Sequence, residues 1–398
     1  MTLPPCKHRG NVLTTKCFCR YPVKPNIVPH ADCNGCQFNK AIPQSAEPKC
    51  EYRTEQIGSL WCSCPHTRGK SIFHCQKLNS PCLLQLDQLG EAANPKNGVK
   101  FKICETCEEC KISRFEPKRL AVVNAIFNPT RSTRIIENYH RFKESLGAVE
   151  MTTVELTFDG QSPQIPSMHI EGDSRVHTLW QKERLINIGL KSLESDVDAV
   201  AWIDPDVVCR SGEWLERTID ALRDFPVVQM FRDVAWLDSD GHTERMFPSH
   251  VAKRNGKGVK GWGHTGFAWA ARRSFLADGL FDAEITGGAD VMLAEAFDGN
   301  LDHRRISQAP PGLRSAFCRW ANGKRTRVGF VDVEIEHLFH GTWSDRQYNP
   351  RAAWLAEHDF DPAVDIQLDE LDLWRWSPMV DPELRRKVEN YFPGRRDG

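Results

Sequence analysis

Two aspartates, one residue apart, follow an apolar run near the middle of the chain. The run from Ala199 to Ile203 has the length of a strand, and Asp204-Pro205-Asp206 comes directly after it. Side chains at positions i and i+2 of an extended segment point the same way, so both carboxylates can face one cation or one diphosphate. Ligands bind at the carboxyl ends of strands in an α/β sheet. The triplet therefore predicts a metal or phosphate site, although turns and helix N-caps also use aspartate.

Further residues with suitable chemistry lie later in the chain. Asp290 follows Gly287-Gly288-Ala289, and the glycines permit a close approach of substrate. We expect Asp290 to be a general base, with capping of the helix that follows it as the alternative. His337 and His340 lie three residues apart, and imidazole nitrogens suit a borderline divalent cation. A packing or capping role for either histidine is the competing interpretation.

The hydrophobic pattern predicts the elements that must position these residues. A continuous apolar run is typical of a strand buried in a parallel sheet, and apolar residues at helical spacing predict a helix. Alternation of the two predicts a doubly wound α/β layer, and we expect a catalytic domain over residues 119–346. The expected order is a strand at 120–127, a helix at 132–146, a strand at 151–158, a helix at 179–193 and the strand that leads into Asp204.

The stretch from Trp180 to Leu190, followed by Asp204-Pro205-Asp206, resembles the core of GT-A glycosyltransferases, most closely the β-1,4-galactosyltransferase type. The resemblance implies a GT-A (Rossmann-like) fold and a nucleotide-sugar donor. It places Trp180, Lys182 and Arg184 beside the nucleotide, together with Asp204. It also implies that Asp206 binds manganese.

Two later segments extend the resemblance. Residues 263–275 and 281–290 are similar to the small-residue strand, helix and Gly-Gly-acid-acid segment of that family, and the resemblance makes Asp290 the catalytic base. His337 and His340 resemble the Met-x-x-His pair that completes the metal sphere with Asp206. The sequence departs from the family at Ala289, where an acid is usual, and at Thr286, where a tryptophan stacks on the acceptor. Neither galactose nor that acceptor is therefore carried over.

Two segments flank or interrupt this core. The basic, glycine-rich loop at residues 254–263 can close over a donor diphosphate and offer Trp262 to the face of an acceptor sugar, with an ordinary surface loop as the alternative. The C-terminal segment, residues 347–398, predicts two helices, at 352–358 and 382–391. Its aromatic residues are better explained by packing against the catalytic layer than by ligand binding.

Residues 1–118 contain 13 of the 15 cysteines. Short cysteine pairs separated by ten or more residues suit tetrahedral zinc, and such modules are too small to fold by packing alone. We expect small, loop-rich, zinc-binding modules, with disulfides or an iron–sulfur cluster as alternatives. Two similar units and a third cluster are formed by Cys6, Cys17, Cys19, Cys33 and Cys36, by Cys50, Cys62, Cys64, Cys75 and Cys82, and by Cys104, Cys107 and Cys110.

Charge and hydropathy limit the classes of partner. Residues 1–119 carry 18 Lys and Arg against 10 Asp and Glu, whereas the whole chain has a net charge of -1. Thiolates bound to metal would cancel much of this basic surplus, so nucleic-acid binding is not favoured. No apolar run has the length of a signal peptide core or a membrane helix. A soluble, cytoplasmic protein is expected.

Together these patterns predict a metal-dependent, inverting glycosyltransferase of the hexosyltransferase type. It would move a sugar from a nucleotide-sugar donor to a hydroxyl group on a glycan, a protein or a small molecule. A nucleotidyltransferase is the alternative enzyme, since it also uses a doubly wound sheet and an acid-bound metal. The non-enzymatic alternative is a zinc-module binding protein with an inert α/β domain. In either case the cysteine modules could contact a protein partner.

Overall fold

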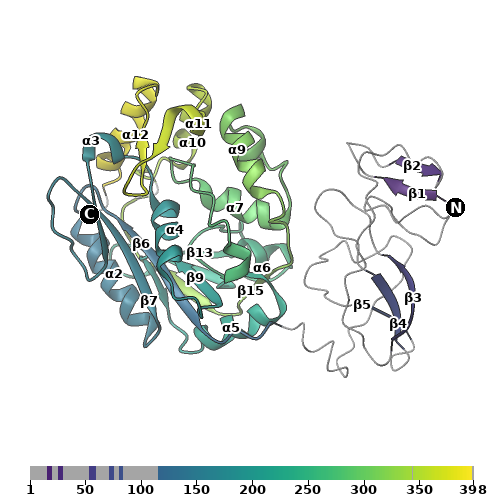
Figure 1. Cartoon of the computed structure of the whole chain (residues 1–398). Helices are drawn as coiled ribbons and strands as arrows, with labels where there is room; N and C mark the ends of the chain where they lie inside the picture. The colour runs from purple at the N-terminus through teal and green to yellow at the C-terminus, as the bar shows by residue number, and fades with distance from the viewer. Residues whose placement is uncertain are drawn as a thin grey trace. The chain divides into compact units, whose positions relative to one another are not determined.

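The computed structural model describes residues 115–342 and 344–396, together with the backbone of five strands within residues 1–114. The chain divides into two compact units, Met1–Phe115 and Glu116–Gly398. The second unit spans both the predicted catalytic region and the predicted C-terminal segment. Figure 1 shows the elements of each unit, whose relative placement is not determined.

The first unit contains two small antiparallel sheets. β1 (Lys16–Cys19) pairs with β2 (Asn26–Pro29), and β4 (Ser71–Cys75) lies between β3 (Arg53–Ser59) and β5 (Ser80–Leu83). The side chains of the 13 cysteines lie outside the described residues, and so do the predicted metal sites. Zinc binding by this unit stays a prediction.

The second unit is built on a seven-stranded, mostly parallel sheet, which confirms the predicted α/β class. β6 (Leu120–Phe127) pairs in parallel with β7 (Met151–Phe158) on one side and with β9 (Ala199–Ile203) on the other, and every residue of β9 is buried. β6 and β9 are apolar runs, as burial on two faces requires. The strand order is β15 (Val328–Phe330), β11 (Val227–Gln229), β14 (Ala268–Arg272), β9 (Ala199–Ile203), β6 (Leu120–Phe127), β7 (Met151–Phe158) and β8 (Met168–Gly172), with only β14 antiparallel to its neighbours.

Helices cover this sheet. α4 (Lys182–Ser192) packs against β6 and β7, and α5 (Trp214–Asp224) packs against β11, β14 and β15. A Cβ atom at Gly189 of α4 would lie 2.6 Å from a methyl group of Val123, so glycine lets the helix approach the sheet closely. The other helices that the structure describes between residues 115 and 342 are α2 (Thr133–Leu146), α3 (Ser174–His177), α6 (His250–Arg254), η4 (Arg273–Leu276), α7 (Ala289–Asp298), α8 (Arg304–Ser307) and α9 (Pro311–Ala321).

A second sheet of four strands was not foreseen in the sequence. Its order is β10 (Val207–Cys209), β16 (Glu334–His337), β12 (Asp233–Leu237) and β13 (Thr243–Pro248). The apolar stretch at residues 328–335 is divided between β15 and β16, which belong to different sheets. The second sheet consequently connects the region of His337 to the strand that follows Asp206.

The C-terminal segment packs against the first half of the unit, as its aromatic residues predicted. Tyr391 and Phe392 are buried, and the side-chain amide of Gln181 both donates to and accepts from the backbone of Trp374. Figure 1 shows these elements in yellow-green and yellow beside α3. They are α10 (Tyr348–Glu357), α11 (Pro362–Asp365), β17 (Ile366–Leu368), β18 (Trp374–Trp376) and α12 (Pro382–Gly394).

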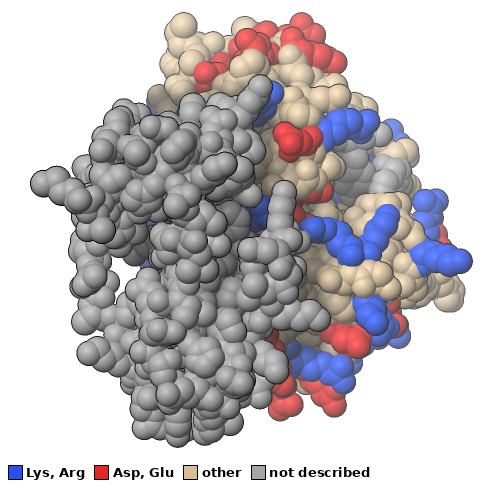
Figure 2. Space-filling view, turned by 90° about the vertical axis from the view of Figure 1, so that its right-hand side faces the viewer, with Lys and Arg blue, Asp and Glu red and all other residues tan. Residues whose placement is uncertain are grey.

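The surface of the described part carries charges of both signs. On the face in Figure 2, Lys and Arg side chains are interspersed with those of Asp and Glu. Among the residues that the structure describes, no helix has both the length and the apolar character needed to cross a membrane.

Candidate active site and metal centre

A cavity of about 160 Å³ opens where β6 and β9 end. Asp204 and Asp206 enter it from the segment after β9, and elements from the C-terminal segment close one side. The location is where ligands bind in open α/β sheets. Of the predicted site residues, those that line this cavity are Trp180, Lys182, Asp204, Asp206, Asp290, His337 and His340.

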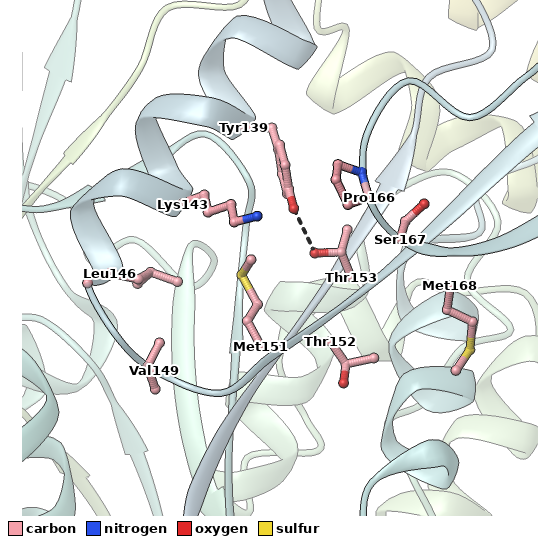
Figure 3. A pocket seen from close by; sticks show the side chains of 11 residues that line it. Tyr139, Lys143, Leu146, Val149, Met151, Thr152, Thr153, Pro166, Ser167 and Met168 are labelled. Atoms are coloured by element: carbon pink, nitrogen blue, oxygen red, sulfur yellow. Dashed lines mark hydrogen bonds between the residues drawn. The ribbon is translucent and has the colours of Figure 1, made fainter.

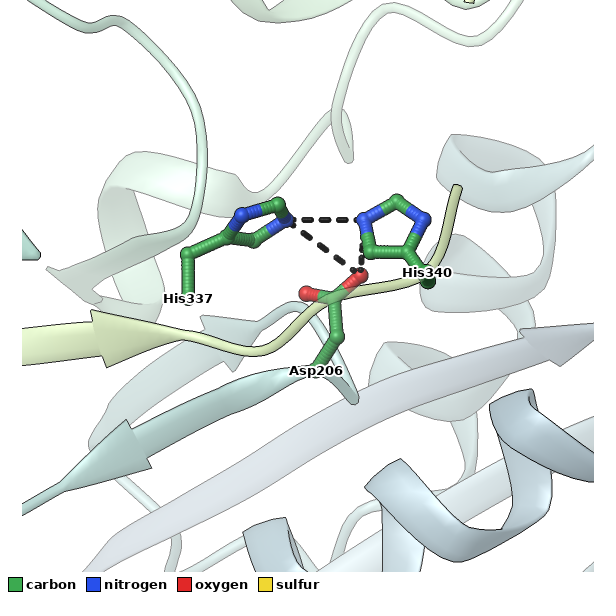
Figure 4. A group of neighbouring side chains, drawn as sticks. All are labelled: Asp206, His337 and His340. Carbon is green, nitrogen blue, oxygen red and sulfur yellow. Dashed lines mark hydrogen bonds and ion pairs between the residues drawn. The ribbon is translucent and has the colours of Figure 1, made fainter. Parts of the chain in front are cut away.

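Asp206, His337 and His340 form a compact group of ligand atoms (Figure 4). The Nε2 atoms of the two histidines lie 2.8 Å apart. Oδ2 of Asp206 lies 3.0 Å from Nε2 of His340 and 3.8 Å from Nε2 of His337. Residues more than a hundred positions apart in the chain therefore meet, as the sequence predicted.

The pairing of the second sheet explains why these residues meet. β10 and β16 are antiparallel, and Val207 lies opposite His337. The backbone N–H of Leu338 also donates to the carbonyl of Asp206 at 2.8 Å. Because strand register fixes which residues face each other, Asp206 and His337 are held at adjacent ends of paired strands.

The histidine region is rigidly packed. The ring of His337 lies 4.8 Å from Trp236 and 4.7 Å from Phe267, and His264 stacks on Phe267 at 3.9 Å. Burial lowers the pKa of His337 to about 4 and that of His264 to about 3, against the raising influence of Asp206. Neutral imidazoles, which can bind a cation, are therefore favoured near pH 7.

The three residues fit a divalent cation. Oδ1 of Asp206 is buried, and no hydrogen-bond partner reaches it from the described residues. A buried carboxylate oxygen without a partner is costly, and a bound cation would satisfy it. Two imidazole nitrogens and one carboxylate suit manganese, iron or zinc better than calcium, and three protein ligands leave positions open for a substrate.

Beside this group, one lysine links the two remaining acidic residues of the cavity. Nζ of Lys182 lies 3.2 Å from Asp204, and 3.1 Å and 3.2 Å from the two carboxylate oxygens of Asp290. It also lies 3.5 Å from the carboxylate of Glu183. Lys182 thus holds Asp204 and Asp290 at one place, although they are far apart in the sequence.

The pKa values of this cluster reflect its burial. Burial opposes the charge of Lys182, but Asp204, Asp290 and Glu183 outweigh it and raise the pKa of the lysine well above its usual range. Burial raises the pKa of Asp204 to about 7 and that of Glu183 to about 8, and Lys182 acts in the opposite direction on both. Perturbed titratable groups that meet in a cavity are typical of catalytic sites.

The loop that presents Asp290 is fixed by Glu284. The buried Glu284 carboxylate accepts hydrogen bonds from the Gly288 N–H, at 2.5 Å, and from both the N–H and the hydroxyl of Thr286. Arg305 pairs with the same carboxylate at 2.9 Å. The loop is therefore held by a network of charge-assisted hydrogen bonds, and Asp290 begins α7 at a defined position.

Two predicted site residues lie elsewhere. Arg184 does not line the cavity: its guanidinium contacts Asp282 at 3.0 Å and Asp372, so the structure does not bring it together with Lys182 and the acidic residues. Arg184 is two residues after Lys182, a rotation of roughly 200° about the helix axis, which sends the two side chains to opposite sides of α4. Trp262 is 46% exposed and also lies outside the cavity lining, where its ring contacts His264 at 5.2 Å.

The sequence interpretation missed the contribution of the C-terminal segment. Arg346, Arg351, Tyr391 and Arg395 line the cavity, and the three arginine side chains are largely buried. Arg346 donates to the carbonyl oxygen of His340. The recurrence of arginines among the aromatic residues of this segment was the available signal, but packing alone was inferred from it.

A larger cavity of about 480 Å³ lies between α2, the start of β7 and the loop before β8 (Figure 3). It shares no lining residue with the first cavity. Lys143 is its charged lining residue, and the Tyr139 hydroxyl lies 3.2 Å from that of Thr153. This arrangement offers no metal ligands and no acid–base pair, so size does not identify the site of chemistry here.

No family model and no curated protein sequence matches the chain. Among solved structures, it is similar to glucosyl-3-phosphoglycerate synthase from Mycobacterium tuberculosis, with 12% identity, a TM-score of 0.32, and coverage of 68% of this chain and 89% of that one. The catalytic domain of Drosophila β1,4-galactosyltransferase 7 shows 11% identity, a TM-score of 0.32, and coverage of 69% and 98%.

A third structure is 4-diphosphocytidyl-2C-methyl-D-erythritol synthase from Anaerococcus prevotii, with 14% identity, a TM-score of 0.25, and coverage of 55% of this chain and 88% of that one.

Proposed function

We propose that the second unit is a GT-A-type, metal-dependent glycosyltransferase that moves a sugar from a nucleotide-sugar donor to a hydroxyl acceptor with inversion. One observation carries the proposal: the Asp206–His337–His340 group and the Lys182-linked carboxylates line the same cavity. Sugar transfer needs a site for a leaving diphosphate beside a base for the acceptor, and the cavity provides both.

The metal group serves the leaving diphosphate. A divalent cation bound by Asp206, His337 and His340 would neutralise the negative charge that develops as the bond to the sugar breaks. Arg346, which contacts the backbone of His340, adds a fixed positive charge on the same side. Lys182 orients Asp204 toward the donor.

Asp290 is the proposed general base. Its carboxylate accepts the proton of the acceptor hydroxyl, whose oxygen attacks the anomeric carbon from the face opposite the diphosphate, so the configuration inverts. Lys182 holds this carboxylate in place, with Nζ 3.1 Å from Oδ1 of Asp290. Base catalysis of this kind contributes about 10²- to 10⁴-fold to the rate.

The remaining lining supplies places for the nucleoside and the acceptor. Apolar atoms of Phe127 and Ile135, with the side chain of Asn138, line the part of the cavity near β6 and α2, and we assign the nucleoside to it. Trp262, with its exposed ring beside His264, is the proposed acceptor platform.

The volume of the cavity is smaller than the ~300 Å³ or more of typical ligand sites, and arginines of the C-terminal segment line it. Donor entry therefore requires these side chains to move. The first unit has no catalytic part in this proposal. We assign its cysteines a structural zinc role, which metal analysis of the purified chain tests directly.

Thermal unfolding with nucleotide diphosphates tests the proposal. Because a ligand that binds only the folded state stabilises it, UDP or another nucleoside diphosphate should raise the unfolding temperature with Mn²⁺ present and much less without it. Asp206→Asn should remove this metal dependence. A screen of common nucleotide sugars should then show slow, Mn²⁺-dependent hydrolysis that releases nucleoside diphosphate.

The same assays separate the alternatives. Release of pyrophosphate from a nucleoside triphosphate and a sugar phosphate, with no hydrolysis of any nucleotide sugar, would identify a nucleotidyltransferase. If nucleotides do not change the unfolding temperature, with or without Mn²⁺, this result would contradict both enzymatic functions. It would favour a binding protein with an inert α/β unit.

A further inference from the structure

One residue in the lining of the cavity has no part in the proposed mechanism so far. His264 lines the cavity together with Asp206 and Asp290, yet it does not belong to the metal group. An imidazole ring has two nitrogens, and in the neutral form one donates a hydrogen bond and the other accepts one. The contacts of these two nitrogens therefore decide whether His264 can bind a substrate.

The backbone of His264 is held from both sides. Its N–H donates to the carbonyl oxygen of Pro248, and its own carbonyl oxygen accepts from the N–H of His250, each at 2.9 Å. The same carbonyl oxygen accepts from the side-chain amide of Gln229 at 2.7 Å. The imidazole stacks on Phe267, with 3.9 Å between the ring centres. Backbone and ring both have a fixed position, as a group that orients a substrate requires.

Strained backbone follows this histidine. Phe267 has a φ of 81°, in the left-handed region that residues with a side chain rarely adopt. Its carbonyl oxygen accepts a hydrogen bond of 2.7 Å from the N–H of Asp204. Such a conformation persists only where the surrounding structure enforces it, and it is common at active sites. Here it ties the His264 segment to the acidic residues that follow β9.

The hydrogen bonds of the ring identify its protonated nitrogen. Nδ1 accepts a hydrogen bond of 3.2 Å from the N–H of Gly266, so Nδ1 carries no proton. Burial lowers the pKa of His264 to about 3, and the ring is neutral near pH 7. The one ring proton is therefore on Nε2. No hydrogen-bond partner for Nε2 lies among the described residues, so this N–H is a donor that they do not use.

This donor lies beside the proposed base. A Cβ atom at Gly266 would be 3.0 Å from Oδ2 of Asp290 and 3.5 Å from Cε1 of His264, the carbon bonded to Nε2. The edge of the imidazole and the carboxylate therefore lie against the same side of Gly266. In the described part of the chain, the Asp290 carboxylate pairs with Lys182 and makes no hydrogen bond with His264. Glycine keeps the space next to both groups open to the cavity that they line.

We propose that His264 binds the attacking oxygen of the acceptor, with Nε2–H donating to this oxygen while Asp290 accepts its proton. The inference rests on the proposed function, to which it adds a residue that touches the acceptor. A hydroxyl group has one proton and two lone pairs. The proton passes to Asp290, and one lone pair accepts from His264. The other lone pair forms the bond to the anomeric carbon as the bond from that carbon to the diphosphate breaks.

The same count of lone pairs defines the class of acceptor. An amine has a single lone pair, and a hydrogen bond from Nε2–H would occupy the pair that must attack. An alcohol or a water molecule can accept this hydrogen bond and still attack. The arrangement therefore selects an oxygen nucleophile, such as a sugar hydroxyl, over a nitrogen nucleophile. His264 keeps its proton and stays neutral throughout.

Two substitutions separate the roles of the two ring nitrogens. His264→Asn places an amide oxygen where Nδ1 lies, which keeps an acceptor for the Gly266 N–H but removes the Nε2–H donor. His264→Gln places an amide NH₂ near the position of Nε2 and loses the acceptor for Gly266. The assay is Mn²⁺-dependent hydrolysis of the nucleotide sugar that the unmodified chain cleaves fastest, in which water takes the place of the acceptor hydroxyl. His264→Asn should lower kcat about tenfold or more, and His264→Gln by no more than about threefold.

Donor binding and stability are measured on the same variants. The rise in unfolding temperature with UDP and Mn²⁺ should equal that of the unmodified chain in both, because His264 touches the acceptor and not the donor. Without ligands, His264→Gln should unfold at a lower temperature than His264→Asn, since only His264→Gln loses the hydrogen bond to Gly266. His242→Asn is the matched control, with a side chain that is 79% exposed, and it should leave kcat unchanged.

The reverse order of rates, with His264→Gln slower than His264→Asn, would show that the ring only supports the Gly266 turn, and it would overturn the inference. Full activity of His264→Asn would overturn it as well. If one variant does not fold, the kcat expected for the other decides. Failure of the proposed function is a different result: the unmodified chain then hydrolyses no nucleotide sugar and does not respond to UDP with Mn²⁺.

Discussion

Replacement of Asp290 by asparagine isolates the proposed base from the rest of the cavity. The change preserves the size of the side chain and one oxygen acceptor, but it removes the negative charge that lies 3.1 Å and 3.2 Å from Nζ of Lys182. Because an amide cannot accept the hydroxyl proton, kcat should fall about 10²- to 10⁴-fold, which is a loss of about 3–5 kcal/mol of transition-state stabilisation. The Asp290 carboxylate is not part of the metal group, so donor affinity should remain within about threefold.

The assay needs two readouts on the same preparation. Transfer or hydrolysis rates give kcat, and the rise in unfolding temperature with UDP and Mn²⁺ gives donor affinity. Asp302→Asn provides a control, because it makes the same chemical change at an exposed position of the same unit. A kcat close to that of the control would remove Asp290 from the mechanism. A large loss of donor affinity with an unchanged kcat would show that Asp290 binds the donor instead.

Three further variants test other parts of the account. His340→Gln should weaken Mn²⁺ binding by about tenfold or more, measured by Mn²⁺ titration with UDP present, and unchanged affinity would exclude this ligand. Arg184→Met should lower the free energy of unfolding by about 1–3 kcal/mol, because it removes the cation from the partly buried Asp282, which keeps its hydrogen bond from Asn187, yet it should not alter donor affinity. Burial raises the pKa of Glu183 from 4.5 to about 8, so its contribution to stability is fully present below pH 4.5 and is lost as the pH rises through about 8. The free energy of unfolding of Glu183→Gln should therefore rise relative to that of the unmodified chain as the pH increases from 4.5 to about 8, by up to about 1.4 kcal/mol per pH unit in denaturant unfolding. A difference between the two chains that does not change with pH would contradict the raised pKa of Glu183.

The sequence predicted best those elements whose patterns are local. The strands at 120–127 and 151–158 are continuous apolar runs, and their bounds agree with β6 and β7. The helix expected at 132–146 agrees with α2 to within one residue at its start. A strand buried on both faces has a continuous run of apolar residues, and a helix buried on one face has apolar residues at helical spacing. Either pattern is visible within one short stretch of sequence.

The second sheet could not be predicted in this way. β10 has three residues and β16 has four, too few to show a period, and β16 follows β15 of the first sheet after a short break in one apolar region. Pairing across long stretches of chain, such as that of β10 with β16, is set by tertiary packing. The meeting of Asp206 with His337 was predicted from the resemblance of His337 and His340 to a metal-binding Met-x-x-His pair, and not from strand patterns.

The errors at the site have a common cause. Arg184 was placed beside the nucleotide by the resemblance, and the arginines of the C-terminal segment were given no role, because a position in the chain does not give the direction of a side chain. Arg184 is turned toward Asp282, whereas Arg351 and Arg395 reach the cavity from elements that were expected only to pack. A long flexible side chain can serve either role, and only its packed neighbours decide between them.

The most direct measurement of the central claim is the location of manganese in crystals grown with Mn²⁺ and UDP, found from anomalous scattering. The account predicts a peak bounded by the Asp206 carboxylate and the Nε2 atoms of His337 and His340, with the diphosphate beside it. A manganese peak remote from these three residues, or UDP bound in another cavity, would contradict it.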